Sequence, residues 1–404
     1  MAWTSFISDN KWVILAYLIL ILIVYINRKK FVVENKIFLL YRTKHGVDFI
    51  NDFADRHREF VKILGYTAIG VGFVGMIAIM VMFGVGLYNL IFVPGAPATV
   101  SLAIPGVQVP GSQFKIPFVY GMLSLFVVIL FHEFGHGIVA RANGIKIKST
   151  GIGLLGPLPL AFVEPDEKQI TKTPSHVQHS IFAAGPFFNV ILCVILFALI
   201  HVLIYPVMNA MTQPTGVTFD QLITGEAAQK YGLQPGEVYT KINDINTINT
   251  DQLSTFLTCM VPNQSITFFS DKGNVTVITG TNPDNHNKGY LGVKSIGLHQ
   301  ELKTKNGFVR AIYSILSVFA NPNSTSLADY KLLEWIFTLS LGIGLANLLP
   351  LGPVDGGRMT YTAFVDIKGK EKGAKWWGTL TWITLAVLAL LLFVPIIRHF
   401  LPGF

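Results

Sequence analysis

The sequence carries few charged residues for its length. Asp, Glu, Lys and Arg make up 13% of the 404 residues, whereas 51% are hydrophobic. Soluble proteins carry about a quarter charged residues, so a surface that faces only water is excluded. Cysteine is also scarce, because only Cys193 and Cys259 are present. Two cysteines exclude a disulfide framework and a cysteine-rich metal site.

Positive charge is in excess, and the positions of the basic residues indicate which class of protein this is. The formal net charge is +8, and the basic residues gather in three segments between long apolar stretches. By contrast, Pro94–Lys115 holds a single basic residue, Lys115. Cytoplasmic loops of membrane proteins collect Lys and Arg in this way. The pattern favours a membrane protein over a nucleic-acid-binding one. It places the N-terminus outside and the three basic loops in the cytoplasm.

Six apolar stretches are long enough to indicate membrane-spanning helices. A helix needs about 20 apolar residues to cross the hydrocarbon core of a bilayer. The sequence therefore predicts a polytopic α-helical membrane protein with about six transmembrane helices. The predicted spans are Trp12–Ile26, Ala68–Val93, Ile116–Ala140, Ile181–Val207, Leu332–Leu351 and Trp376–Ile397.

One segment, residues 215–300, has the pattern of a folded soluble domain. Its short β-rich runs alternate with turn residues such as Pro235-Gly236 and Asp271-Lys-Gly273. Short helices are predicted at Glu226–Tyr231 and Thr250–Leu257. We expect a small inserted α+β domain, which the charge pattern places on the outer side of the membrane.

The segment Ile145–Val163, between the third and fourth predicted spans, is apolar and rich in Gly and Pro. Irregular or strand-like backbone at membrane depth must be buried in protein or line a cavity. We therefore predict a re-entrant β-hairpin beside the third span. The run Gly151-x-Gly153-x-x-Gly156 matches a dinucleotide fingerprint, but Pro157 and Pro159 argue against the helix that such a site needs.

Three ionisable residues stand together near the end of the third predicted span, in His132-Glu133-Phe134-Gly135-His136. Positions i and i+4 share one face of a helix, so both imidazoles can reach one metal ion. Ionisable side chains inside a span are costly unless they have a partner. Glu133 would sit beside the ion and could take a proton from its bound water. The pattern predicts a zinc site.

A catalytic zinc commonly has three protein ligands and an open position, so a third ligand is needed. Val139 and Ala142 exclude the metzincin pattern, which needs glycine and histidine there. Asp355 is the better candidate, because it follows the fifth predicted span in Asn347-Leu-Leu-Pro-Leu-Gly-Pro-Val-Asp355-Gly-Gly. That span is predicted to emerge on the same cytoplasmic side as His136.

These motifs resemble those of the site-2 protease family of intramembrane metalloproteases. His132-Glu-Phe-Gly-His136 and Asn347-x-x-Pro-x-x-x-x-Asp355-Gly-Gly are similar to its two metal motifs. Gly185-Pro-Phe-Phe-Asn189 resembles its third motif. The soluble segment, with Gly232-Leu-Gln-Pro-Gly236, resembles the PDZ domain that many bacterial members carry. The resemblance runs from about Tyr120 to Asp366.

The resemblance implies an intramembrane zinc metalloprotease that carries out regulated intramembrane proteolysis in the cell membrane. His132, His136 and Asp355 would bind Zn²⁺, and Glu133 would be the general base. Asn189 and Asn347 would contact the substrate backbone or the developing oxyanion. The hairpin, with Gly151 and Gly153, would pair with an unwound substrate. Substrates would be single-pass membrane proteins that another protease has already trimmed, with the active site toward the cytoplasm and the PDZ-like domain outside.

The residues predict five regions along the chain. They are an N-terminal membrane region (1–115), the first part of the protease core (116–210), the PDZ-like domain (215–300), an amphipathic linker (301–330) and the second part of the core (331–404). The linker would lie on the outer membrane surface or pack against the helix bundle. Alternative functions are a transporter or channel with His132 and Asp355 as ion-binding groups, a non-catalytic PDZ scaffold, and a prenyl-protein protease with a glutamate as third ligand.

Overall fold

The computed structural model describes most of the chain after residue 31 as two compact units. The described residues are 32–34, 38–93, 98–107, 109, 115–155, 158–248, 250–283, 285–324 and 327–400, with Leu15, Ile19, Leu22 and Ile26. The first predicted span, Trp12–Ile26, lies outside the described residues apart from those four. The first unit comprises Met1–Ala198 and Leu332–Phe404, and the second comprises Leu199–Lys331.

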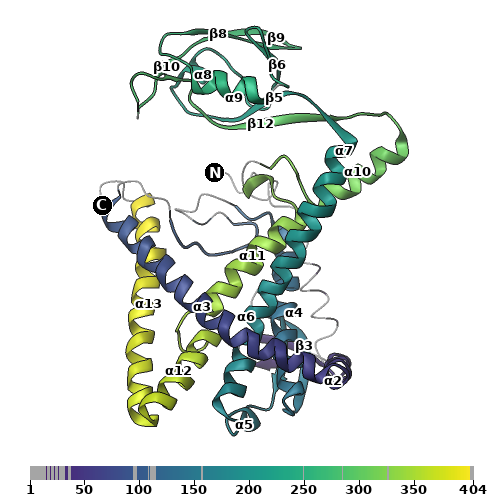
Figure 1. Cartoon of the computed structure of the whole chain (residues 1–404), viewed down its shortest axis with the longest axis vertical. Coiled ribbons are helices and arrows are strands. Elements are labelled where there is room, and N and C mark those ends of the chain that lie inside the picture. Colours follow the sequence, from purple (N-terminus) through teal and green to yellow (C-terminus); the bar gives the residue numbers. More distant parts are fainter. Residues whose placement is uncertain are drawn as a thin grey trace. The chain divides into compact units, whose positions relative to one another are not determined.

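The first unit is a bundle of helices with a small sheet at its side (Figure 1). The helix α4 carries the His132 motif, and α6 packs against α3, α4 and α11. A core of aliphatic and small side chains, including Ala68, Ile138 and Ala183, lies between these helices. The helices are α2 (His45–Arg56), α3 (Arg58–Phe92), α4 (Phe118–Ala142), α5 (Glu167–Ile170), α6 (Ser175–Ala198), α11 (Leu332–Asn347), α12 (Asp355–Lys368) and α13 (Lys370–Phe400).

Among the described residues, four helices are long and apolar enough to cross a membrane. They are Arg58–Phe92, Phe118–Ala142, Ser175–Met211 and Lys370–Arg398, and they correspond to four of the six predicted spans, with two of those spans extending one or two residues beyond a helix end. The helix α11 has 16 residues and ends at Asn347, before the predicted end of its span. Pro350 and Pro353 follow, and proline cannot continue a helix without losing a backbone hydrogen bond.

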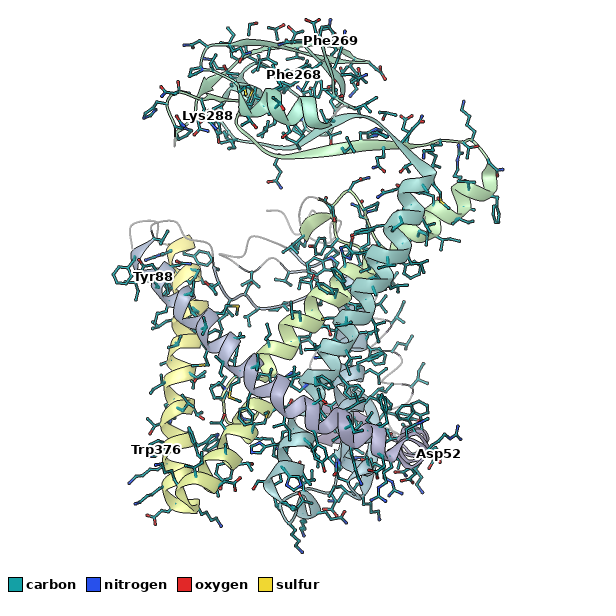
Figure 2. All side chains as sticks on the ribbon, in the orientation of Figure 1. Asp52, Tyr88, Phe268, Phe269, Lys288 and Trp376 are labelled. Atoms are coloured by element: carbon teal, nitrogen blue, oxygen red, sulfur yellow. The ribbon has the colours of Figure 1, made fainter. Side chains whose placement is uncertain are left out.

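Exposed aromatic side chains lie near the ends of two of these helices. Tyr88, near the C-terminal end of α3, is 60% exposed, and Trp376, in the second turn of α13, is 54% exposed (Figure 2). Tyr and Trp are enriched where membrane helices meet the headgroup region. The positions of both side chains therefore agree with helices that span a bilayer.

The sheet of the first unit has four antiparallel strands in the order β1-β2-β3-β4. They are β1 (Val32–Glu34), β2 (Phe38–Thr43), β3 (Ile147–Leu155) and β4 (Leu158–Pro165). Strands β3 and β4 form the hairpin expected from the sequence, and β4 packs against α4. The sequence did not indicate β2, which pairs with β3 from Phe38↔Leu155 to Thr43↔Thr150.

The second unit is a mixed α and β structure with a hydrophobic core of its own. Phe219, Tyr239 and Phe268 are fully buried, and their rings pack against one another with centroids 5.6–5.7 Å apart. Phe268 is labelled in Figure 2 beside Phe269, its neighbour on β8. The larger sheet has the order β12-β5-β6-β8-β9, with β7 paired to β6.

Two helices of the second unit lie where the sequence predicted them, within one residue at each end. The predicted helices correspond to α8 (Ala227–Lys230) and α9 (Thr250–Thr258), and α10 (Gly307–Phe319) follows. The two longest strands, β5 and β12, were not predicted. The remaining elements are η2 (Leu199–Ile204), α7 (Tyr205–Met211), β5 (Thr212–Leu222), β6 (Val238–Ile242), β7 (Ile245–Asn246), β8 (Ser265–Ser270), β9 (Gly273–Ile278), β10 (Gly280–Thr281), β11 (Gly289–Tyr290), β12 (Val293–Leu302) and η3 (Leu327–Asp329).

Candidate metal centre

His132 and His136 lie one helical turn apart on α4, on the face that packs against α6. The Nε2 atoms of the two imidazoles are 3.2 Å apart. The ring of His132 is buried, and that of His136 is nearly so. Two nitrogens this close inside a hydrophobic helix bundle need a shared partner, because burying unpaired polar groups is costly.

Asp355 brings a carboxylate to the same point from the first turn of α12. Its Oδ2 lies 3.0 Å from Nε2 of His132 and 3.3 Å from Nε2 of His136. The ligand atoms of these three residues all lie within 4.8 Å of one another. The sequence separates Asp355 from His132 by 223 positions, so the fold creates this cluster.

The spacing of these atoms fits a tetrahedral zinc ion. Zinc binds His nitrogen and carboxylate oxygen at about 2.0–2.1 Å, which places neighbouring ligand atoms of a tetrahedron about 3.3 Å apart. The three observed separations are 3.0, 3.2 and 3.3 Å. Two histidines and an aspartate leave the fourth position for water or substrate, as a hydrolytic site needs. The acid in the cluster is an aspartate, not the glutamate of a prenyl-protein protease.

Gly185 of α6 leaves room beside these ligand atoms. A Cβ added to Gly185 would lie 2.6 Å from Nε2 of His132 and would collide with Nε2 of His136. A side chain here would fill the space in which an ion would sit. The role of this glycine explains why the Gly185-Pro-Phe-Phe-Asn189 motif occurs on a helix that supplies no metal ligand.

The helix α6 also supplies a polar partner for the second ring nitrogen of each histidine. Nδ1 of His136 lies 2.7 Å from the carbonyl oxygen of Ile181. Nδ1 of His132 lies 3.3 Å from the amide of Asn189, whose side chain is completely buried. Metal-binding histidines commonly donate their second N–H to an oxygen, as His136 can to the carbonyl of Ile181, and this fixes the tautomer and the ring orientation.

The first turn of α12 is held in place by its neighbours. An added Cβ at Gly356 or Gly357 would collide with carbonyl oxygens of Leu348 and Leu351, so the preceding loop can approach the helix only because both residues are glycine. The indole Nε1–H of Trp377 donates to the carbonyl oxygen of Gly357 at 2.9 Å. A helix N-terminus also favours a negative charge such as that of Asp355.

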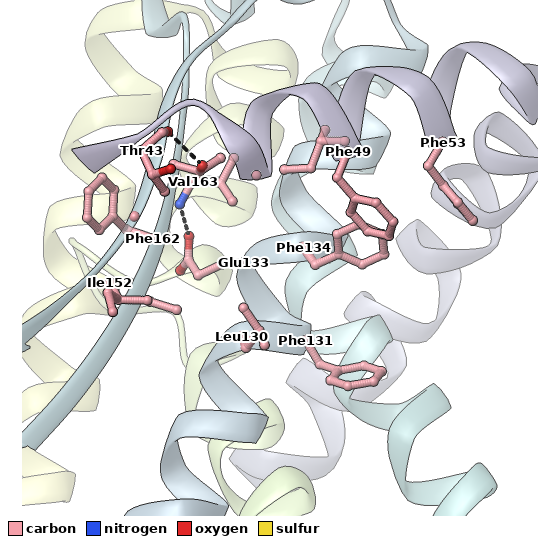
Figure 3. A pocket seen from close by; sticks show the side chains of 15 residues that line it. Thr43, Phe49, Phe53, Leu130, Phe131, Glu133, Phe134, Ile152, Phe162 and Val163 are labelled. Carbon is pink, nitrogen blue, oxygen red and sulfur yellow. Dashed lines mark hydrogen bonds between the residues drawn. The ribbon is translucent and has the colours of Figure 1, made fainter. Parts of the chain in front are cut away.

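Glu133 lies between the metal-binding cluster and the sheet. Its Oε2 accepts a hydrogen bond from the backbone N–H of Val163 on β4, at 3.1 Å (Figure 3). It also lines a polar cavity of about 250 Å³ together with His132, His136 and Asp355. The carboxylate is therefore placed where it can exchange a proton with a molecule bound at the cluster.

The other residues predicted to contact substrate lie in different surroundings. Asn347 lines the polar cavity, and its amide donates to the carbonyl oxygen of Ile343 at 3.1 Å. Gly151 and Gly153 lie on β3, between β2 and β4, where an added Cβ would meet carbonyl oxygens of β2. The substrate contacts of Asn189, Asn347 and both glycines remain predictions.

Several residues that build the site gave no signal in the sequence. Arg358 lines the polar cavity, and its guanidinium donates to Glu167 at 2.6 Å and stacks 4.0 Å from the ring centroid of Phe182. The carbonyl of Ile181 and the N–H of Val163 are backbone groups, which carry no side-chain signature. Their roles depend on helix and strand positions that only the packed structure defines.

Comparison with known proteins gives a family match that includes the residues of this metal centre. The model of Peptidase family M50 matches residues 120–391. A protein of Methanocaldococcus jannaschii described as uncharacterised is 27% identical over 261 residues, which are 64% of this chain and 60% of that protein. A putative zinc metalloprotease of Clostridium acetobutylicum is 23% identical over 335 residues, with 69% of this chain and 96% of the relative covered.

The zinc metalloprotease RasP of Shouchella clausii is 23% identical over 268 residues, which are 57% of this chain and 61% of that protein. The chain thus spans less than two thirds of the length of two of these three relatives. The family match itself covers well over half of this chain, and His132, Glu133, His136 and Asp355 all fall within it. This chain therefore belongs to peptidase family M50, the site-2 proteases, and is a zinc metalloprotease.

Proposed function

We propose that this chain hydrolyses peptide bonds within or near the transmembrane segments of other membrane proteins. One observation carries the proposal: ligand atoms from α4 and α12 meet at a polar cavity that Glu133 also lines. Two of the helices that line this cavity, α4 and α6, belong to apolar helices long enough to span a bilayer. A substrate that is itself embedded in the membrane can reach such a site without leaving the bilayer.

His132, His136 and Asp355 are the proposed zinc ligands, and Glu133 is the proposed general base. Zinc in this site would polarise the scissile carbonyl and lower the pKa of a bound water. Glu133 takes the proton from the attacking water and passes it to the leaving nitrogen. The hydrogen bond from Val163 N–H restrains the carboxylate at the edge of the cavity.

The sheet is the proposed binding surface for an unwound substrate. Peptide bonds within a helix are shielded, and an extended segment can add to the free edge of a sheet. Strand β3 is paired on both sides, whereas β4 pairs with β3 alone in the part of the chain that the structure describes. The N–H of Val163, on β4, donates to Glu133 and not to β3. A substrate added there would run past the general base, and the amide of Asn347 would contact its backbone.

The membrane orientation is part of the same proposal. The basic segments between spans favour a cytoplasmic position for the loops that follow α4 and α12, which places the metal centre toward the cytoplasm. The second unit is then extracytoplasmic, and its mixed fold suits a PDZ-like domain that binds or excludes outer parts of a substrate. Single-pass proteins trimmed by an earlier protease would be the preferred substrates in regulated intramembrane proteolysis.

The test uses the full chain, purified in detergent and mixed with a single-pass membrane protein whose outer part has been removed. Glu133→Gln should lower the cleavage rate by about 10²- to 10⁴-fold, as expected for loss of a general base, and should keep the bound zinc. Asp355→Ala should lose both zinc and cleavage. Cleavage by Glu133→Gln at the wild-type rate, or zinc bound normally by Asp355→Ala, would contradict the proposal.

A further inference from the structure

A second cavity, of about 550 Å³, lies beside Glu133 and contains none of the three candidate zinc ligands (Figure 3). Its walls come from α2, α4, the β3–β4 hairpin and the end of β2. Phe49 and Phe53 of α2 and Phe134 of α4 form an aromatic group on one side, with ring centroids 5.6–6.4 Å apart. Ile152 and Ala161 lie on the strands opposite. Apart from Glu133 and two threonines, the side chains around the cavity are hydrocarbon.

The apolar cavity and the polar cavity meet at Glu133. Glu133 and Val163 line both of them, and the carboxylate accepts the N–H of Val163 at their boundary. A peptide that binds with its scissile carbonyl at the metal centre therefore passes next to the opening of the apolar cavity. Because the two cavities share these two residues, one bound peptide could contact both.

The position of Glu133 identifies the part of the substrate that faces the apolar cavity. When the peptide bond breaks, Glu133 gives a proton to the leaving nitrogen, so that nitrogen must lie within hydrogen-bond distance of the carboxylate. The residue that carries this nitrogen is then the one whose side chain lies nearest to the apolar cavity. The residue on the carbonyl side lies toward the zinc ligands.

We propose that this cavity binds the side chain of the substrate residue on the amine side of the scissile bond, and that it selects a large apolar residue there. The inference rests on the proposed function and adds a substrate class to it. A pocket of this kind discriminates by about 10- to 200-fold for each methylene group that it buries. Leucine or phenylalanine would be favoured, alanine would bind weakly, and lysine would bring its charge into a cavity lined mostly by hydrocarbon side chains.

The open side of the cavity fits a substrate that arrives from the bilayer. Phe49, Leu130 and Ile152 at its rim are 61%, 44% and 48% exposed, and all three are apolar. Leu130 belongs to α4, one of the helices long enough to span a membrane. An apolar side chain of a transmembrane segment can therefore move from lipid into the cavity without contact with water.

The main experiment fills the cavity and measures the substrate preference. Ala161 is buried on β4 and lines the cavity, so Ala161→Phe should occupy much of the space. Purified enzyme is given substrates that carry Ala, Leu, Phe or Lys directly after the cleaved bond, with the cut mapped by mass spectrometry. Wild type should cleave the Leu and Phe substrates at least about 10-fold faster than the Ala substrate. Ala161→Phe should abolish or reverse that preference.

Two further variants serve as a control and as an independent test of the cavity. Ala386→Phe makes the same substitution at an exposed position on α13, and it should retain the wild-type preference. Phe49→Ala enlarges the cavity from its exposed rim and should raise the relative rate for a Trp substrate, even if Ala161→Phe fails to fold. An identical preference in wild type, Ala161→Phe and Phe49→Ala would overturn the inference and leave a lipid chain as the better candidate occupant.

A trapping measurement separates this inference from the proposed function. Ile152→Cys is placed at the rim of the cavity in a Glu133→Gln, Cys259→Ser background, and the substrate carries one cysteine. A disulfide should form when the substrate cysteine directly follows the scissile position, and not when it precedes it. If the disulfide forms but the wild-type enzyme cleaves no substrate, the proposed function is contradicted and the inferred pocket still stands. If the wild-type enzyme cleaves the substrate but the disulfide forms with the residue before the scissile bond, only the inferred pocket is contradicted.

Discussion

At the scale of single residues, the metal centre depends on how the two histidine rings are held. Each ring offers Nε2 to the cluster and Nδ1 to a group on α6. For His136 that group is the carbonyl of Ile181, which no side-chain substitution can remove. For His132 it is the amide of Asn189. Rotation of that amide by half a turn brings Oδ1, which has no hydrogen-bond partner among the residues that the structure describes, to the position where it accepts Nδ1–H.

This geometry predicts that Asn189 acts as a positioning residue for His132. Asn189→Leu, which removes the acceptor and keeps the volume, should weaken zinc binding by about 10- to 100-fold, the usual effect of losing such a partner. Asn189→Asp keeps an acceptor at the same place and should restore most of the affinity. Zinc affinity is measured by competition with a chromogenic chelator, so the result does not depend on catalysis.

The same pair of variants separates positioning from simple packing. If Asn189 only fills space, Asn189→Leu should keep its zinc and Asn189→Asp, which buries a charge, should be the weaker binder. That order of affinities would contradict the positioning role. It would favour the substrate contact that the sequence predicts for Asn189.

At the scale of secondary-structure elements, the short helix α2 decides the shape of the apolar cavity. It packs against α4 with Ile50 and Ala54 buried in the core, and an ion pair near its end adds to this contact. Arg141 of α4 donates to both carboxylate oxygens of Asp55, with distances of 3.1 and 2.7 Å. Arg58, which begins α3, also donates to the carbonyl oxygen of Ala142 at 3.0 Å. These contacts hold the N-terminal region against the catalytic helix.

The ion pair predicts a pH dependence for the docking of α2. The hydrogen bonds from Arg141 lower the pKa of Asp55 below its ordinary value of 3.8. A lowered pKa means that the pair stabilises the folded protein at neutral pH, and that this stabilisation is lost as the pH falls below 3.8 toward the folded-state pKa. Asp55→Asn should therefore lower the thermal unfolding midpoint modestly near neutral pH, and the difference from wild type should shrink in acid.

The matched control is Asp52→Asn, which removes the same charge from an exposed position on α2. It should change the unfolding midpoint less than Asp55→Asn near neutral pH. Equal effects of the two variants, or a difference between Asp55→Asn and wild type that grows in acid, would show that the pair with Arg141 does not stabilise this docking.

At the scale of the whole molecule, the membrane orientation connects the two units to the proposed reaction. In the proposed orientation, the second unit lies outside the cell and the loop after α4 lies in the cytoplasm. Cys259 is exposed on the second unit, whereas Cys193 is buried in α6. A membrane-impermeant maleimide applied to intact cells should therefore label Cys259. Labelling of Cys259 in intact cells would show that the second unit lies outside the cell.

The control for the labelling places a cysteine on the opposite side. Lys168→Cys, at an exposed position on α5, is made in a Cys259→Ser background and should react only after the cells are permeabilised. If Lys168→Cys were labelled in intact cells, and Cys259 of the parent protein were not, the orientation would be the opposite of the one proposed.

The family region begins near residue 120, but the molecule uses residues before it at the site. Strand β2 covers one side of β3, and α2 supplies one wall of the apolar cavity. The substrate preference that we infer therefore depends on a part of the chain outside the family match. Members of the family that differ in this region can keep the same metal centre and select different substrates.

The sequence by itself determined the chemistry of the metal centre and much of the architecture. His132 and His136 are one helical turn apart, so helix geometry alone places them together. Hydrophobic length predicted the long helices, because a bilayer imposes a minimum span. The two short helices of the second unit, α8 and α9, were also predicted, because local sequence signals mark where they begin and end. In each case the deciding interactions are between residues close in the chain.

Only the tertiary structure decided which distant groups complete the site. Asp355 was a candidate by its motif, but its distance to the histidines depends on how α12 packs against α6. The carbonyl of Ile181, the N–H of Val163 and the pairing of β2 with β3 leave no mark in the sequence, because every residue has the same backbone groups. Their roles arise from contacts between segments far apart in the chain, which local patterns do not encode.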